Sequence, residues 1–305
     1  MRFFIVDVFA VGPLSGNQLA VFLPEEMLSD EVMQRLAKEM NVSEATFVVP
    51  GGPTAGTYGV RIFTPEYEVP FAGHPSLGTA HVIRTELRGG CVDRVDLQLE
   101  VGLVPVAFEH PLYWMRQPCP TFGATLPSGA VAEVLGIAEG SIDARFPIQE
   151  VSTGLPHILI PVNTLDTLRS IRVSSARYFE LIESLWAKNL FVFCQEPRHP
   201  ENHLSVRMFS EYLGVDEDAA TGSGNGCLAA YMLRHRYLGT DKVDVRSEQG
   251  HEVGRPSLLH LQAWEAGGDI QVRVGGTAIT VARGEFLVPG GQRSRPVCAD
   301  SPMEG

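Results

Sequence analysis

The sequence predicts an α/β (α+β) protein built from two similar β-rolls, each a mixed, mostly antiparallel sheet wrapped around a central helix. Three observations lead to this fold class. Residues 61–84 and 207–234 repeat one pattern, in which a strand precedes a glycine-rich turn and an apolar helix. Short runs of β-branched and aromatic residues outnumber helical patterns along the chain. The helix expected at 225–238 is apolar on every side, so a curled sheet must enclose it.

The two copies of the pattern match residue by residue, in the strand and again at the start of the helix. The matching pairs are Arg61 and Arg207, Phe63 and Phe209, Thr64 and Ser210, Gly73 and Gly222, His74 and Ser223, and Ala80 and Ala229. The spacing between the copies is close to half of the 305 residues. We therefore expect two like domains whose helix starts face each other across a cleft.

The limits of these halves follow from composition. The stretch 111–129 is rich in proline and glycine and is expected to contain the boundary. The first half is then 1–116, completed by a returning C-terminal strand at about 278–288, and the second half is 117–277. Residues 289–305 have no periodicity and are expected to form a loose tail.

Strands are expected from the first residues onward. The N-terminal run MRFFIVDVFAVG is apolar on both faces of its alternation and is interrupted by Asp7, which favours a buried strand over a signal peptide. Further strands are expected at TFVV, VRIF, VDLQLEV, LVPVAF, HILIPV, LFVFC, HLSVRMF, LLHLQAW, DIQVRV and ITVARGEFLV.

Five helices are expected, of two kinds. The segments 29–41, 128–135 and 175–187 carry apolar residues on one face and are predicted to be amphipathic surface helices. The segments 75–87 and 225–238 follow the two glycine-rich turns and are predicted to be the central helices of the rolls.

Composition excludes several classes of function. Apolar residues make up 44% and charged residues 20% of the chain, as in ordinary globular enzymes. A net charge of −12 argues against a nucleic-acid partner, and no apolar run approaches the ~18 residues of a membrane span. The five cysteines form no CxxC pair, so neither a disulfide framework nor a metal site is expected. A cytoplasmic protein is the expectation.

Three segments hold residues suited to chemistry. In FAGHP, Gly73 permits close backbone approach, and His74 precedes a helix whose free N–H groups bind anions. In EDAATGSGNG, an anion nest opens the second central helix, with Asp218 beside it as an acceptor or acid/base. In MNVSEATFVV, Glu44 falls between a helix and a strand, where a carboxylate can be aimed into a cleft.

Each segment also has a plainer interpretation as a helix cap or a solvated loop. Asn17, which opens a strand after a turn in SGNQLAVF, is typical of turn chemistry. So are Gly154 to His157, which are expected to occupy a tight turn before a strand in STGLPHILIPV. The spacing of Gly224, Gly226 and Ala229 fits a dinucleotide loop, but the preceding EYLGVDEDAAT is no buried strand and its acidic residues would repel a pyrophosphate.

Taken together, these segments resemble a known family. VDVFAVGPLSGNQLAVF, MNVSEATFVV, RIFTPEYEVPFAGHPSLGTA, TGLPHILI and DEDAATGSGNG are similar to the phenazine-biosynthesis PhzF-like proteins of the diaminopimelate-epimerase-like superfamily. The similarity runs from about residue 3 to residue 288 in the family's order. It implies two rolls with a site in the cleft between the two helix starts.

The resemblance implies a role for each site residue. The catalytic residues would be Glu44, as acid/base, with Asp218 and His74. The substrate-binding residues would be Asn17, Gly73, His74, Gly222, Ser223, Gly224 and Asn225. No cofactor and no metal is implied. The partners would be a small-molecule carboxylate substrate and a second copy of the chain, in a homodimer.

The resemblance also narrows the reaction. Superfamily racemases use one cysteine per half, and the corresponding positions here are Ala72 and Thr221, which excludes a two-thiol mechanism. A one-base proton shift by a cofactor-independent isomerase remains. The namesake reaction isomerises trans-2,3-dihydro-3-hydroxyanthranilate, but the second loop reads GSGNGC where the commoner pattern is GSA followed by apolar residues. The substrate therefore stays open. Two alternatives also stay open: a small-molecule or protein-binding family member with little turnover, and an NAD-dependent dehydrogenase.

Overall fold

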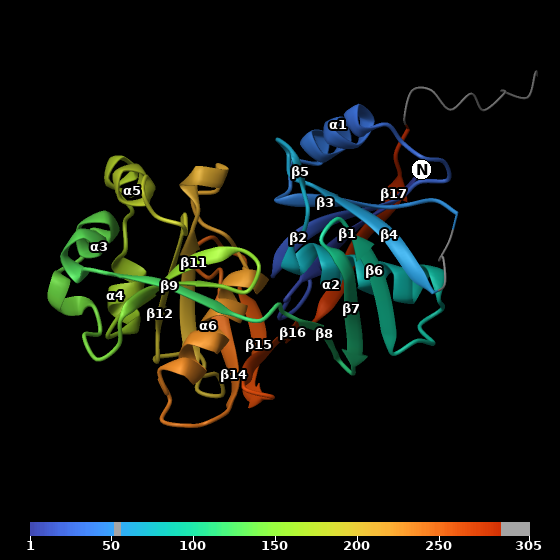
Figure 1. Ribbon diagram of the computed structural model, residues 1–305. Coiled ribbons are helices and arrows are strands. Elements are labelled where there is room, and N and C mark those ends of the chain that lie inside the picture. The colour runs from blue at the N-terminus through green and yellow to red at the C-terminus, as the bar shows by residue number, and fades with distance from the viewer. Residues whose placement is uncertain (52–55, 288–305) are drawn as a thin grey trace, which may run out of the picture.

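The protein is described by a computed structural model that covers residues 1–51 and 56–287, so the predicted tail at 289–305 and residue 288 of the returning strand lie outside the described residues. Two lobes lie side by side, as Figure 1 shows. The first lobe contains β1 (Arg2–Val8), β2 (Asn17–Leu23), β3 (Glu44–Val48), β4 (Thr57–Phe63), β5 (Glu68–Val69), β6 (Arg94–Leu99), β7 (Gly102–Glu109), β8 (Leu112–Arg116) and β17 (Ala278–Glu285). The second lobe contains β9 (Thr121–Leu126), β10 (Ile148–Ser152), β11 (Pro156–Pro161), β12 (Asn189–Cys194), β13 (Leu204–Phe209), β14 (Val243–Gln249), β15 (Ser257–Ala266) and β16 (Asp269–Gly276).

The two lobes repeat one order of strand pairing. In the first lobe neighbouring strands run β17-β1-β2-β3-β4-β6-β7-β8, and in the second they run β9-β10-β11-β12-β13-β14-β15-β16. The parallel pairs fall at equivalent places, β2–β3 and β4–β6 in one lobe and β11–β12 and β13–β14 in the other. The predicted pair of mixed, mostly antiparallel rolls is confirmed.

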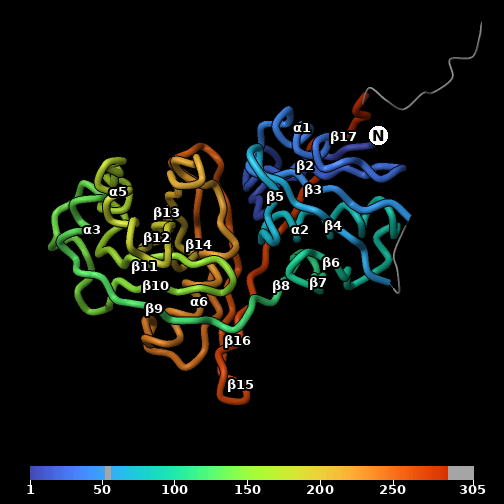
Figure 2. Tube along the Cα trace, turned by 45° about the horizontal axis from the view of Figure 1, so that its top comes forward, coloured from blue at the N-terminus to red at the C-terminus, as the bar shows by residue number. Residues whose placement is uncertain are grey.

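The chain crosses between the lobes twice. It leaves the first lobe after β8 and enters β9, and it returns from β16 into β17, which pairs with β1 (Figure 2). The proline-rich stretch 111–129, expected to contain the boundary, holds both β8 and β9 and the short crossing between them. β8 pairs with β16, so the sheet continues from one lobe to the other. The residue limits of the two predicted domains stay a prediction.

Two of the three predicted surface helices begin and end close to their predicted limits. α1 (Asp30–Met40) starts where Ser29 Oγ accepts a hydrogen bond from Val32 N, and α3 (Ser128–Leu135) ends at the left-handed Gly136. The chain also forms α4 (Leu165–Ser170), α5 (Ser175–Ile182) and the short turns η1 (Ile83–Leu87), η2 (Glu139–Ser141) and η3 (Glu211–Leu213).

The helix predicted at 175–187 is too long, because the chain leaves the helix after Ile182. The ammonium of Lys188 binds the carbonyl oxygens of Ile182 and Glu183. The backbone N–H of Ala187 meanwhile donates to the buried carboxylate of Glu150, at 2.8 Å. These tertiary contacts outweigh the apolar stripe that the sequence offers over the last turn.

The two central helices fill the rolls. α2 (Gly73–Val82) and α6 (Gly222–Arg234) are buried along nearly their whole length, as predicted for helices that a sheet encloses. α2 continues directly into η1, a short π-helix, so the helical segment ends at residue 87 as the sequence predicts. Gly78 lets α2 approach the sheet, since a Cβ there would lie 2.6 Å from Leu19 Cδ2 and 2.8 Å from Val8 Cγ2.

Phe9 is hydrogen-bonded to two distant segments at the junction of the lobes. Its side chain is fully buried and its φ of 59° is uncommon for a bulky residue. Its N–H donates to Thr277 O at 2.8 Å, and its carbonyl accepts from Leu258 N at 2.9 Å, which holds this conformation. Nearby, Arg255 donates to the fully buried carboxylate of Asp7, at 2.7 Å, and so ties the second lobe to the first. Across the described ranges, no helix is long and apolar enough to cross a bilayer.

Candidate active site

The starts of α2 and α6 meet at the lobe junction. A Cβ added to Gly73, the first residue of α2, would lie 3.4 Å from the Cα of Gly222, the first residue of α6, and 3.4 Å from Ser223 N. The first intrahelical bonds are those of Ser76 N and Asn225 N, so the amides before them have no partner within their helices. Two helix N-termini therefore bring partial positive charge and free N–H donors to one place.

Glu44 and His74 face each other beside these helix starts. Glu44 is the first residue of β3, and its Oε2 lies 3.3 Å from His74 Nε2 in the first turn of α2. Both atoms are buried, and neither has a hydrogen-bond partner among the described residues. The Glu44 side chain keeps 20% of its surface exposed, so it reaches solvent at one edge.

Burial sets the protonation of this pair. Desolvation, and next the charge of Asp218, raise the pKa of Glu44 to about 8. Desolvation also lowers the pKa of His74 to about 3, against a hydrogen bond with the backbone of Gln18. At neutral pH the pair is therefore a largely protonated carboxyl beside a neutral imidazole. It is no ion pair, and the carboxyl can gain or lose a proton near neutral pH.

Asp218 is held in place by two side chains. Asn17 Nδ2 donates to its Oδ1 at 2.8 Å, and Thr221 Oγ1 donates to its Oδ2 at 2.6 Å. Asn17 also donates to Ala220 O at 2.9 Å, so the start of β2 in the first lobe holds the loop that precedes α6 in the second. Burial raises the pKa of Asp218, and these hydrogen bonds oppose the rise.

Asn225 serves the interior of the second lobe. It is fully buried, and its Nδ2 donates to Thr221 O at 3.1 Å and to Gln249 Oε1 at 3.0 Å. Gln249 in turn binds Thr221 N and Asp218 O, each at 3.0 Å. This amide network fixes the loop before α6. Nothing in the sequence pointed to Gln249, which ends β14 and meets the loop only through the fold.

Two glycines bracket Ser223. A Cβ on Gly222 would lie 3.3 Å from Phe9 Cζ, and a Cβ on Gly224 would lie 2.3 Å from Phe191 Cε2. The Ser223 hydroxyl itself lies 3.1 Å from Nε2 of His157, on β11. The rings of Phe9 and Phe191 lie so close to the backbone that they leave little room for a side chain at either position, which explains the GSG sequence.

The structure supports neither a reactive thiol nor a dinucleotide-binding loop beside these residues. Cys227 lies inside α6, where burial raises the pKa of its thiol to about 12, so it stays a neutral thiol. The segment before the GSG loop contains the short turn η3, not a strand, so the dinucleotide fingerprint lacks its structural context. Within the described residues, no group of three His, Cys, Asp or Glu side chains is placed to hold a metal ion.

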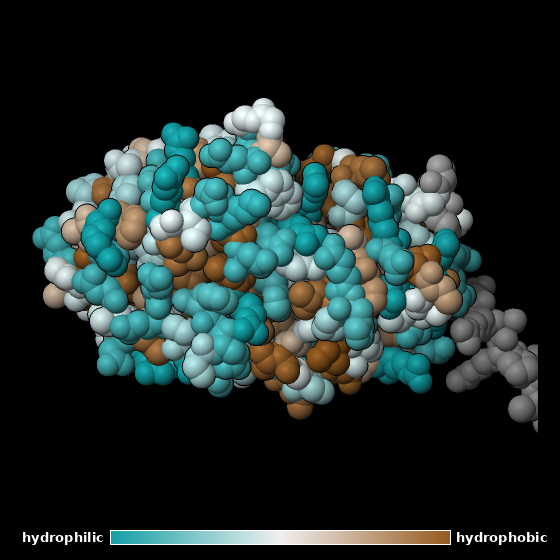
Figure 3. Space-filling view, turned by 90° about the horizontal axis from the view of Figure 1, so that it is seen from below, coloured by the Kyte–Doolittle hydropathy of each residue, from teal (hydrophilic) through white to brown (hydrophobic). Residues whose placement is uncertain are grey.

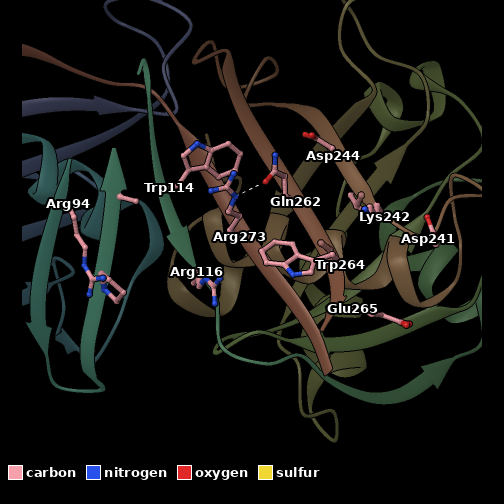
Figure 4. Close-up of a pocket in the computed structure, with 14 residues that line it drawn as sticks. Arg94, Trp114, Arg116, Asp241, Lys242, Asp244, Gln262, Trp264, Glu265 and Arg273 are labelled. Carbon is pink, nitrogen blue, oxygen red and sulfur yellow. Dashed lines mark hydrogen bonds between the residues drawn. The ribbon is translucent and has the colours of Figure 1, made fainter. Parts of the chain in front are cut away.

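The structure also has a large open groove that is separate from the helix starts. It is lined by residues of β6, β7 and β8 from the first lobe and of β14, β15 and β16 from the second. It measures about 1140 Å³, and Figure 4 shows Trp114, Arg116, Trp264 and Arg273 on its wall. Its charges are of both signs, and it contains none of the predicted site residues. Figure 3 shows the mosaic of hydrophilic and hydrophobic residues on the face seen from below. The unpartnered pair of Glu44 and His74 lies at the helix starts and not in this groove.

Comparisons with known proteins agree with this fold. The family model of phenazine biosynthesis-like proteins matches residues 6–284. The trans-2,3-dihydro-3-hydroxyanthranilate isomerase of Pseudomonas aeruginosa is 36% identical, over 93% of this chain and 98% of its own. A PhzF-family phenazine biosynthesis protein of Bacillus anthracis superposes with a TM-score of 0.84 at 26% identity, covering 94% of this chain and 99% of its own.

A more distant structure shows the same fold in another family. A probable proline racemase of Agrobacterium radiobacter superposes with a TM-score of 0.60 at 11% identity, covering 96% of this chain and 94% of its own. The repeated pairing order, the paired helix starts and the match over nearly the whole chain lead to one conclusion. The chain belongs to the phenazine biosynthesis-like protein family and is an isomerase of the PhzF type.

Proposed function

We propose that this isomerase shifts a proton on a small carboxylate-containing substrate without a cofactor, with Glu44 as its single acid/base. One observation carries the proposal. Glu44 Oε2 and His74 Nε2 are buried 3.3 Å apart beside two converging helix starts, and neither has a hydrogen-bond partner within residues 1–51 and 56–287. Buried polar atoms are ordinarily satisfied, and unsatisfied ones mark places where a ligand or a reacting group belongs.

The chemistry follows from the position of these groups. The carboxylate form of Glu44 removes a proton from a carbon next to an unsaturated or carboxylated system. The electron pair moves into that system, and the new carboxylic acid returns the proton to another carbon on the same face. One C–H bond breaks, one forms and the double bond moves, so no oxidant, reductant or water is needed.

The helix starts stabilise the charge that develops on the substrate. The first-turn amides of α2 and α6 converge there, with the Ser223 hydroxyl beside them. Fixed donors of this kind act in a site that excludes water, where they are worth more than in solution. Asp218, oriented by Asn17 and Thr221, and His74 would hold a polar substituent of the substrate.

The pKa of Glu44 suits a group that is base and then acid. With a pKa of about 8, about a tenth of the carboxyl is ionised at pH 7. A carboxylate with an ordinary pKa would be fully ionised but a weaker base, and one with a much higher pKa would be ionised too rarely at pH 7 and would hold the proton too tightly to return it. The raised pKa of Glu44 thus suits both the removal of the proton and its return.

The substrate class is a small cyclic or aliphatic amino or hydroxy acid. Trans-2,3-dihydro-3-hydroxyanthranilate is the first compound to test, because it is the substrate named for a relative that is 36% identical. Because that relative differs from this chain at most positions, other members of the class belong in the same screen.

The test is a screen for deuterium uptake from ²H₂O into these compounds, read by NMR or mass spectrometry. The wild type is expected to label one compound or more, and Glu44→Gln is expected to lose at least about 10²-fold in rate. Glu39→Gln, on the exposed face of α1, is the matched control and should label at the wild-type rate. A compound that binds tightly to the wild type and to Glu44→Gln alike, with no labelling, would instead indicate a binding protein.

A further inference from the structure

His157 makes a contact that the proposed chemistry does not yet use. Its ring is fully buried on β11, and its Nε2 lies 3.1 Å from the hydroxyl of Ser223, which is 8% exposed. The other ring nitrogen, Nδ1, is buried with no partner among the described residues. The ring also packs edge-on against Phe191, with their centroids 5.8 Å apart.

The protonation state of this ring limits what it can do. Burial lowers the pKa of His157 to about 3, so the imidazole is neutral throughout the working pH range and carries a single N–H. That hydrogen is on Nδ1 or on Nε2. On Nδ1, it would be a buried N–H donor without an acceptor, a rare and costly arrangement. On Nε2, it points at Ser223 Oγ.

The two tautomers have opposite consequences for Ser223. If His157 accepts at Nε2, the serine hydroxyl donates its one hydrogen to the ring and presents only lone pairs to a substrate at the helix starts. If His157 donates from Nε2, the serine oxygen accepts, and its own hydrogen is free. Only the second arrangement adds a donor to the amides that converge at the helix starts, where negative charge is to be bound.

We propose that His157 is a positioning residue, which donates from Nε2 to Ser223 Oγ and thereby directs the serine hydrogen at the anionic group of the substrate. The identity of that group rests on the proposed function, whereas the direction of the hydrogen bond does not. Gly224 contributes to this contact between His157 and Ser223. A Cβ at this position would lie 2.3 Å from Phe191 Cε2 and 3.3 Å from His157 Cε1, so the glycine leaves room for both rings beside the start of α6.

The direct test is the tautomer of His157 in the wild-type protein. Histidine-selective ¹⁵N labelling and NMR would show which ring nitrogen carries the hydrogen, with His157→Gln used to assign the signal. We expect a protonated, pyrrole-type Nε2 and a bare, pyridine-type Nδ1 that persist over the range where the enzyme works. A hydrogen found on Nδ1 would overturn the inference.

Two substitutions test the consequence for the reaction. The amide nitrogen of a glutamine is as many bonds from Cα as His157 Nε2 is, whereas that of an asparagine corresponds to Nδ1. His157→Gln should therefore keep most of kcat, and His157→Asn should lose about 10- to 100-fold in kcat with little change in KM. His235→Asn, at the far end of α6 and bonded to Gln149, is the control and should leave both constants unchanged.

The serine must carry the effect if the inference is right. Ser223→Ala should cost about 10²-fold in kcat, and His157→Asn should cost nothing further in that background. Losses that multiply would overturn the link between the two residues. Failure of the proposed function has a different signature. In that case Glu44→Gln would label substrates at the wild-type rate, while the tautomer of His157 would still be the expected one.

Discussion

Replacing Glu44 by glutamine should make the protein more stable at pH 8, although it removes the central group of the site. Burial and the Asp218 charge raise the pKa of Glu44 from 4.5 to about 8 in the folded protein. Below pH 4.5 the carboxyl is protonated in both states. Between the two values the unfolded chain releases the proton and the folded chain keeps it, so rising pH favours unfolding.

The size of the effect follows from these two values. Each pH unit crossed between 4.5 and 8 costs about 1.4 kcal/mol of unfolding free energy, so the whole interval costs at most roughly 5 kcal/mol. A glutamine has no proton to release and escapes this loss. The free energy of unfolding of Glu44→Gln, minus that of the wild type, should therefore rise steadily from pH 5 to pH 8 and then level off.

Urea unfolding of both proteins at half-unit steps from pH 5 to pH 8.5 measures this difference. Glu39→Gln, on the exposed surface of α1, is the matched control, and its difference from the wild type should stay flat. A flat difference for Glu44→Gln as well would refute the reasoning. Glu44 would then be an ordinary solvated carboxylate, a weaker base than the proposed proton removal from carbon requires.

Three further substitutions have definite outcomes. Asp218→Asn removes a charge that raises the pKa of Glu44, so the acidic limb of kcat/KM against pH should move to lower pH; an unmoved limb would contradict the coupling. Gly224→Ala places a methyl group against Phe191 and should destabilise by about 1–3 kcal/mol in urea, with partial rescue by Phe191→Leu; equal stability would show that the ring moves freely. Arg255→Met leaves a buried carboxylate unpaired and should cost about 3–5 kcal/mol, which thermal or urea unfolding would detect; a loss below 1 kcal/mol would exclude a role for this ion pair at the lobe junction.

Much of the fold was predictable because local patterns and tertiary structure agree. The all-apolar run in α6 requires enclosure, and the repeat of Arg61 to Ala80 in the second half requires a second roll. Boundaries were harder wherever a distant contact decides them. The end of α5 is set by Lys188 and by the buried Glu150, which no periodicity reveals.

The site was predictable in part, for a related reason. Glu44, His74 and Asp218 stand at junctions between elements, where the sequence shows a polar residue in an unusual place. The sequence predicts His157 in a turn, whereas the structure places it on β11, and Gln249 ends β14. Their site partners, Ser223 and Thr221, are distant from them in the sequence. Only the folded structure brings them to the start of α6.

In the proposed mechanism one carboxyl group, that of Glu44, moves one proton, and a single-turnover label transfer tests this most directly. Substrate that carries deuterium at the carbon to be deprotonated is mixed with excess enzyme in ordinary water, and the product is analysed by mass spectrometry and NMR. Because Glu44 is largely screened from solvent, we expect part of the deuterium to reappear at the newly protonated carbon. A product that contains only solvent hydrogen at that carbon, at every pH, would contradict the account.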